Sequence, residues 1–150
     1  MAAKPIDMAK FGDHLKEVGK AIEGEEMASV MAESYDAIVQ NVRDNFTSSV
    51  TPGGDPWPER KKIGDGHPLL IESGDLLQAS TGGGSGHIKV IEPRAVEMGV
   101  SADSIRHAAT HNFGDPSRNI PSREYLGASE DTLEQIGEEI AKDGERFFVQ

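Results

Sequence analysis

Apolar side chains recur at helical spacing in two long stretches of the chain. The first runs from residue 27 to 46, where one falls every three or four positions: Met27, Met31, Tyr35, Ile38, Val42 and Phe46. This spacing predicts an amphipathic helix of about 20 residues with one face in the core. The second stretch lies near the C-terminus and predicts another helix, with a buried face made by Leu133, Ile136, Ile140 and Phe147.

The start of the second helix carries its own signals. Ser129 can cap it, and Glu130 and Asp131 fall in its first turn, where acidic side chains suit the positive end of the helix dipole. A shorter helix is predicted over residues 6–22, where five apolar residues share the helical spacing: Ile6, Phe11, Leu15, Val18 and Ile22.

Period-two alternation replaces the helical period in "HIKVIEPRAVEMGV", which begins at His87. Ile88 and Val90 precede a turn at Glu92-Pro93, and three apolar residues alternate after it: Val96, Met98 and Val100. This pattern predicts a β-hairpin with one buried face. Helices at both ends around a small antiparallel sheet indicate an α+β fold, and 150 residues suit a single domain.

Residues 51–68, "TPGGDPWPERKKIGDGHP", form no regular element, because four prolines and four glycines fall within 18 residues. We expect a long loop or arm here. Trp57 lies in it, followed by the basic residues Arg60, Lys61 and Lys62. Trp57 either folds back onto its own domain or binds a partner, since tryptophan is enriched among interface hot spots. We take Trp57 and the three basic residues as a candidate interface.

Charge and composition exclude several classes of function. The formal net charge is −11, from 26 acidic and 15 basic residues, the wrong sign for a domain that holds nucleic acid by its phosphates. No cysteine is present, so disulfides and thiolate zinc sites are excluded. No apolar run is long enough to cross a bilayer, and charges interrupt the N-terminal apolar residues, which does not fit a signal peptide.

Two histidines stand four residues apart in "RHAATHNFGD", a predicted short helix that Gly114 ends. His107 and His111 have the spacing of zinc proteases, but the glutamate that must follow the first histidine is Ala108 here. A third ligand would have to be His87, His67 or a distant carboxylate. We therefore predict no catalytic residue, metal or cofactor, and keep a small zinc-dependent hydrolase using His107 and His111 as the alternative.

Four landmarks carry a resemblance to a known family. In chain order they are "PWPERKK", "HPLLIESGDLLQAST", "RHAATHNFGD" and "IPSREYLGAS". Their order and spacing resemble the phage virion morphogenesis family, the tail-completion proteins of Mu-like and P2-like phages. The match lies between Trp57 and Ser129, and the flanking helices agree only in pattern.

The resemblance assigns structural roles to ten motif residues: Ser73, Gly74, Leu76, His111, Phe113, Gly114, Pro121, Arg123, Leu126 and Gly127. Two positions depart from the family pattern. His107 stands where tyrosine is usual, and Tyr125 where phenylalanine is usual. The first departure indicates that the histidine pair is accidental. We also expect Arg123 to join the loop after Gly114 to the sheet by hydrogen bonds.

The resemblance implies a non-enzymatic virion protein that acts in tail completion and head–tail joining, at the neck of a tailed phage. Its expected partners are further copies of itself in a closed ring such as a hexamer, the tail terminator or tail tube, and the head–tail connector. It implies neither sequence-specific nucleic-acid binding nor a membrane. The expected location is the virion, and the host cytoplasm during assembly.

Overall fold

The computed structural model describes residues 13, 15–16, 25–61, 66, 68–93 and 95–148, and at the helix ends 25–27 and 144–148 only the backbone. The elements in chain order are α2 (Glu25–Ser48), α3 (Asp75–Ser80), β1 (His87–Glu92), β2 (Ala95–Val100), α4 (Ala108–Phe113), a 3-10 turn (Pro116–Arg118) and α5 (Glu130–Phe148). The helix predicted over residues 6–22 lies outside the described residues, apart from Asp13, Leu15 and Lys16.

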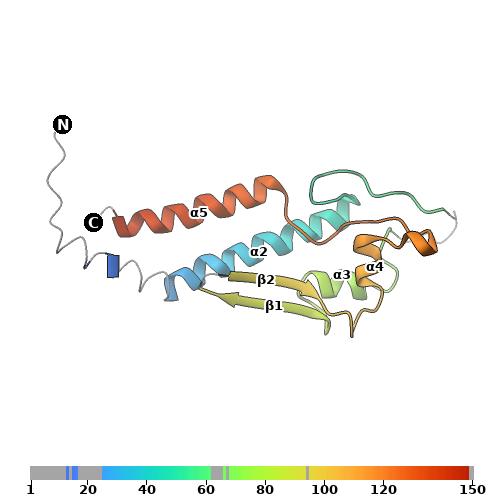
Figure 1. Ribbon diagram of the computed structural model, residues 1–150, viewed down its shortest axis with the longest axis horizontal. Helices are drawn as coiled ribbons and strands as arrows, with labels where there is room; N and C mark the ends of the chain where they lie inside the picture. The colour runs from blue at the N-terminus through green and yellow to red at the C-terminus, as the bar shows by residue number, and fades with distance from the viewer. Residues whose placement is uncertain are drawn as a thin grey trace.

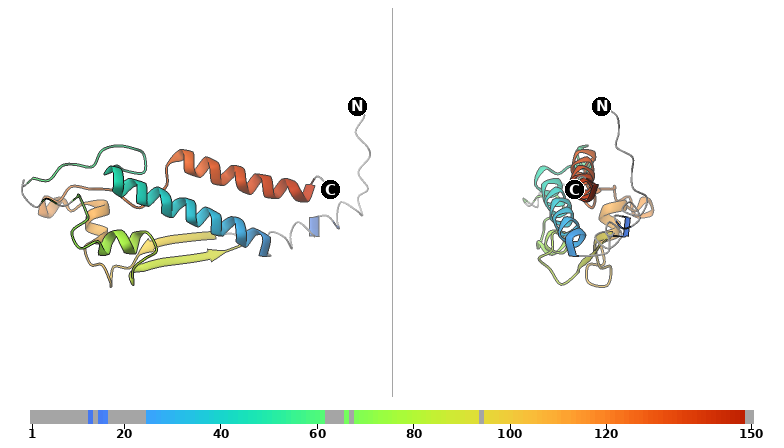
Figure 2. Two further views of the ribbon diagram at one scale, coloured as in Figure 1. Left: turned by 180° about the vertical axis from the view of Figure 1, so that it is seen from behind. Right: turned by 90° about the vertical axis from the view of Figure 1, so that its left-hand side faces the viewer.

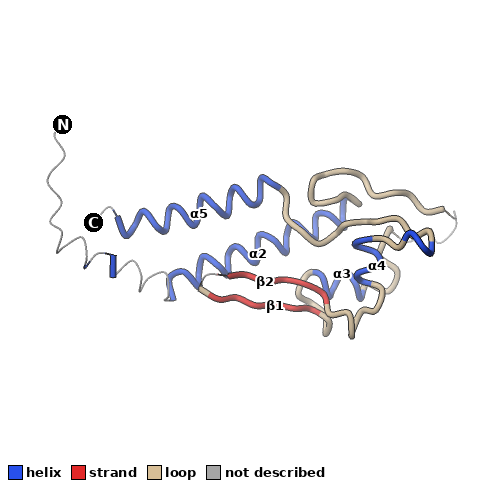
Figure 3. Tube along the Cα trace, viewed as in Figure 1, coloured by secondary structure: helices blue, strands red, loops and turns tan. Residues whose placement is uncertain are grey.

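Helix α2 is the central helix of an elongated molecule (Figure 1). It lies between α5 on one side and the β1–β2 hairpin on the other, and views from behind and along the long axis show the same order (Figure 2). Helices α3 and α4 and most of the loop residues gather at one end (Figure 3). The predicted α+β class is confirmed.

The periodic stretch forms α2, as its spacing predicts. Along its length the buried side chains include Val30, Met31, Tyr35, Val39, Val42 and Phe46. Val42 and Phe46 lie in one core cluster with Trp57. Val30 and Met31 lie in a second cluster, which residues of the hairpin and Ile140 of α5 cover. Charged residues such as Glu33 and Asp44 stay exposed. Burying this stripe stabilises a helix whose backbone propensity alone would be marginal in water. Met27 belongs to the predicted stripe, but its side chain is outside the description.

The predicted hairpin is confirmed. The prediction of its buried face holds for β2 but not for β1. Antiparallel pairing sets Ile91 opposite Val96 and His87 opposite Val100. Residues paired across a ladder share a face, so the face of Val96, Met98 and Val100 is continued on β1 by His87, Lys89 and Ile91. Ile88 and Val90 therefore lie on the opposite face, and Val90 is 37 % exposed.

The inward polar residues of β1 are accommodated by one tyrosine of α2. The Tyr35 hydroxyl and Nε2 of His87 are 2.6 Å apart, and Nζ of Lys89 lies 4.4 Å from the centre of the Tyr35 ring. Nδ1 of His87 donates to the carbonyl of Ala79. Burial and neighbouring Asp36 raise the pKa of Tyr35, so its hydroxyl keeps its proton. A polar strand face is thus tolerated where the alternation rule expects apolar residues.

Helix α5 begins where predicted, since Thr132 N donates to the Ser129 hydroxyl at 3.2 Å. Its apolar face is not buried as predicted. Ile136 and Ile140 are half-buried, and Leu133 is 54 % exposed. Among the elements that the structure describes, α2 is the main neighbour of α5, so the contact covers a narrow stripe. The side chain of Phe147, the fourth predicted position, is outside the description.

Candidate interaction site

The segment 120–127 is joined to the end of α4 by one buried amide. Oδ1 of Asn112 accepts from the backbone N–H of Tyr125 at 3.0 Å and from that of Leu126 at 3.1 Å. The Tyr125 hydroxyl, fully buried, donates to the carbonyl of Ala108 at 2.8 Å. From α2, Nδ2 of Asn45 donates to the carbonyl of Tyr125 at 3.2 Å. Buried backbone groups need such partners, so these side chains fix the path of the "IPSREYLG" landmark.

Two motif glycines are required by close contacts and by a positive φ. Gly114 ends α4 with φ at 76°, and its amide donates to the carbonyl of Thr110. A Cβ there would meet the amide nitrogen of Ser122 at 2.7 Å. Gly127 has φ at 143°, and a Cβ there would meet the Pro52 ring at 2.8 Å. Both positions therefore exclude other residues, which explains why glycine recurs in the landmarks.

Trp57 is not available to a partner, which corrects the candidate interface. Its side chain is 4 % exposed. The ring packs edge-on against Phe46, with ring centroids 5.6 Å apart. The rings of Phe46 and Tyr125 also pack together, with centroids 5.3 Å apart. Nε1 donates to the carbonyl of Glu124 at 2.9 Å. The alternative, that Trp57 folds back onto its own domain, is what the structure shows.

Arg123 holds the same loop in place. Its Nε donates to the carbonyl of Pro58 at 2.8 Å, and one terminal nitrogen donates to that of Glu59 at 3.1 Å. The prediction that Arg123 joins the loop after Gly114 to the sheet was therefore wrong, because its partners lie in the 51–68 loop. That loop begins on the core rather than as a free arm, with Val50 bridged to Pro56.

Two of the three basic residues after Trp57 are described by the structure, and each donates a hydrogen bond to a loop. Arg60 donates to the carbonyl of Pro68 at 2.9 Å, and Lys61 donates to that of Asn119 at 2.7 Å. Lys62 lies outside the described residues. Both described side chains thus brace loops of this end of the molecule, and Lys61 is exposed.

A cleft of about 200 Å³ opens beside α4, and we call it the motif cleft. It is lined by three leucines (Leu69, Leu70 and Leu76), two arginines (Arg60 and Arg123), two histidines (His107 and His111) and the turn Glu72–Gly74. All ten lie within the four landmarks, so they come from four separate stretches of sequence. Only the tertiary structure brings them together.

The histidine pair faces this cleft. The two rings meet edge-to-face with centroids 5.1 Å apart, and Nδ1 of His111 is buried with no hydrogen-bond partner. Burial, His107 and Arg123 all lower the pKa of His111. Among the described residues no group of three or more His, Cys, Asp and Glu side chains is placed to hold a metal. His87 is bound to Tyr35 instead, and His67 is outside the description.

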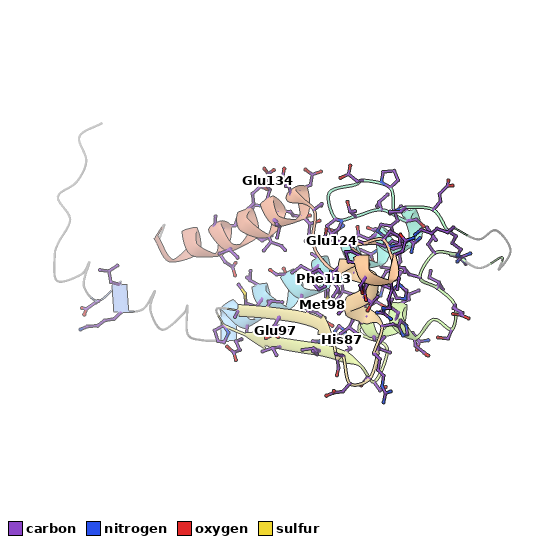
Figure 4. All side chains as sticks on the ribbon, turned by 45° about the vertical axis from the view of Figure 1, so that its right-hand side comes forward. His87, Glu97, Met98, Phe113, Glu124 and Glu134 are labelled. Atoms are coloured by element: carbon purple, nitrogen blue, oxygen red, sulfur yellow. The ribbon has the colours of Figure 1, made fainter. Side chains whose placement is uncertain are left out.

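Phe113 stands out on the other side of α4. Its side chain is 76 % exposed, the most exposed large apolar residue among those described (Figure 4). Asp115 follows it and caps the 3-10 turn, accepting from the Ser117 hydroxyl and, at 2.6 Å, from Nε of Arg118. These hydrogen bonds lower the Asp115 pKa to about 2. The Phe113 ring is thus exposed at the C-terminal end of α4, shortly before the capped 3-10 turn.

A family model for the phage virion morphogenesis family matches residues 6–143, most of the chain and all four landmarks. The chain belongs to the phage virion morphogenesis family. Comparison with curated proteins and with solved structures gave no match.

As a member of this family, the chain is a virion morphogenesis protein of a phage. The structure then explains several of the ten motif residues. Gly114, Gly127 and Arg123 shape the end of α4 and its partner loops, and Ser73 and His111 line the motif cleft. Sequence reasoning missed Asn112, the buried amide at the centre of this arrangement, because an isolated asparagine carries no periodic signal. No helix among the described residues is long and apolar enough to span a membrane.

Proposed function

We propose that this protein completes the phage tail and joins it to the head, acting at the neck as a ring of identical subunits. Membership of the phage virion morphogenesis family carries the proposal. The end of the molecule that carries the motif cleft, called the cleft end below, supports the proposal. It combines hydrogen-bonded loops with an exposed aromatic residue, the kind of side chain that dominates protein–protein contacts.

The proposed partners are other copies of the chain, the tail terminator or tail tube, and the head–tail connector. Phe113 is the residue we expect to contact one of them, since 76 % of its side chain is exposed in the isolated chain. An exposed aromatic residue at the end of α4 is a suitable anchor for such a contact, because aromatic side chains are enriched at protein–protein interfaces. Trp57, which is buried, takes no part in this contact.

We infer a structural rather than catalytic role. The family is one of virion morphogenesis. Ser73, the hydroxyl residue that lines the motif cleft, is hydrogen-bonded to the Asp75 carboxylate at 2.9 Å rather than to a histidine. A zinc-dependent hydrolase would need a third ligand beside His107 and His111, and the described residues supply none. Metal analysis of purified protein, with His107→Ala as the comparison, tests this alternative directly.

The test of the proposed function is a phage or prophage in which this reading frame carries an early stop codon. Lysates should contain DNA-filled heads and separate tails by electron microscopy, with few infectious particles. Adding the purified protein to such a lysate should join heads to tails and restore plaque formation. Normal infectious virions from the mutant would refute the proposal.

A further inference from the structure

The motif cleft has the size and lining of a receptor for an aromatic ring. Its volume of about 200 Å³ exceeds the roughly 150 Å³ of an apolar cavity that binds benzene. Leu69, Leu70 and Leu76 supply apolar surface. The remaining walls include Arg123, His107 and His111, whose planar groups stack on aromatic faces.

The hydrogen bonds inside the cleft favour a ring over a carboxylate. Nε and one terminal nitrogen of Arg123 already donate to the carbonyls of Pro58 and Glu59. Arg60 donates to Pro68, and Glu72 adds a negative charge to the rim. His111 resists protonation, because burial, His107 and Arg123 lower its pKa. A second carboxylate would gain little here, whereas stacking uses the faces of the planar groups and not their N–H donors.

The chain itself displays a ring of this kind, pointing away from its own cleft. His107 and His111 line the cleft, and Phe113 follows two residues later. Two residues turn an α-helix by about 200°, so Phe113 projects from nearly the opposite side of α4. Ala108 and Asn112 occupy the intervening face and are buried in the core. The ring and the cleft are thus fixed on opposite sides of one short helix and cannot meet within one chain.

We propose that Phe113 of one copy inserts into the motif cleft of the next copy. This contact rests on the self-association included in the proposed function. A projection and a complementary cleft on opposite sides of one element make a head-to-tail contact, which repeats from copy to copy and closes into a ring when the rotation between copies allows. Phe113 and the residues of the cleft then serve one interface, although they face apart in the isolated subunit.

Two variants separate the two halves of the contact. Phe113→Ala removes the ring and leaves the cleft. Ser73→Trp fills the cleft from an exposed position on its lining and leaves the ring. Leu133→Ala is the matched control, because it removes another exposed apolar side chain, on α5 and away from the cleft. Circular dichroism of each variant checks that it folds.

Native mass spectrometry and sedimentation of the full chain then measure how strongly each variant associates with itself. The wild type and Leu133→Ala should assemble alike, and each cleft-end variant should associate at least 30-fold more weakly, as expected for loss of a hot spot of about 2 kcal/mol. A mixture of Phe113→Ala and Ser73→Trp should form a 1:1 dimer and nothing larger. Only one intact contact can form between them, between the ring of one and the cleft of the other.

Three results would overturn the inference: assembly of Phe113→Ala at the wild-type concentration, a mixture in which both variants stay monomeric, or a wild type that is monomeric at every concentration. The first two leave the proposed function standing if the wild-type protein still restores head–tail joining in the stop-codon lysate. Failure of that restoration refutes the proposed function, whatever the variants do.

Discussion

The two ends of the molecule are held together in different ways. At the cleft end, side chains distant in sequence satisfy one another: Asn112, Asn45, Trp57 and Arg123 all donate to or accept from backbone groups of other segments. At the other end α5 lies along α2, and of its described side chains, residues 130–143, none is fully buried. A groove of about 230 Å³ remains between these two helices.

This difference indicates where the stability of the isolated subunit lies. A buried side chain with specific partners loses packing and hydrogen bonds together when it is removed, whereas a half-buried stripe loses only a fraction of its apolar contact. The cleft end is therefore a preformed platform. Helix α5, by contrast, keeps apolar side chains that its contact with α2 covers only in part, and Leu133 is 54 % exposed.

The largest effect is expected for Trp57→Ala. The change removes a buried ring packed on Phe46 and its hydrogen bond to Glu124, and should lower the free energy of unfolding by about 3–5 kcal/mol. Urea denaturation followed by circular dichroism measures it. Trp57→Phe keeps an aromatic ring and should cost clearly less. A loss under about 1 kcal/mol for Trp57→Ala would contradict the view that this loop is part of the core.

Next in size is Asn112→Ala. It leaves the buried amides of Tyr125 and Leu126 without their acceptor and should cost about 2–4 kcal/mol. Asn112→Asp is the informative companion, because a carboxylate oxygen can still accept from both amides. If the alanine and aspartate variants were equally unstable at neutral pH, the two hydrogen bonds would not be the reason for the loss.

A smaller effect is expected at the other end, for Ile140→Ala. Ile140 is half-buried against Val30 and Met31, so the change should cost about 1 kcal/mol. Native-state hydrogen exchange sharpens the comparison, since the amides of α5 should exchange faster than those of α2 between Val39 and Phe46. Equal protection in both helices of the monomer would show that the two ends are not distinct in stability.

The smallest effect is a pH dependence that comes from His111. Burial, His107 and Arg123 lower its pKa below the ordinary histidine value of 6.5 in the folded chain, so the unfolded state binds this proton more readily. The stability that the neutral ring contributes is present above pH 6.5 and is lost as the pH falls through the folded pKa. Urea midpoints at pH 7.5 and 5.0 should differ more for the wild type than for His111→Gln. An unchanged difference would show that His111 does not titrate differently on folding.

Local periodicity was sufficient to predict much of the fold. The helices α2 and α5, the Ser129 cap, the hairpin and the Gly114 end of α4 all follow from spacing or from single residues with strong backbone preferences. Periodicity gave the wrong inner face for β1, where Lys89 and His87 point toward Tyr35. Alternation assumes that inward residues are apolar, and one tyrosine on a neighbouring helix was enough to break that assumption.

The sequence by itself determined the two long helices and the hairpin of this protein, its acidic charge and its family. These depend on local spacing, on composition and on short motifs. The tertiary structure decided which side chains meet. It buried Trp57, directed Arg123 to Pro58 and Glu59, and left Phe113 exposed while joining four stretches into the motif cleft. The physical reason is that burial and hydrogen-bond partners are set by segments distant in the chain, and their meeting is invisible to any local pattern.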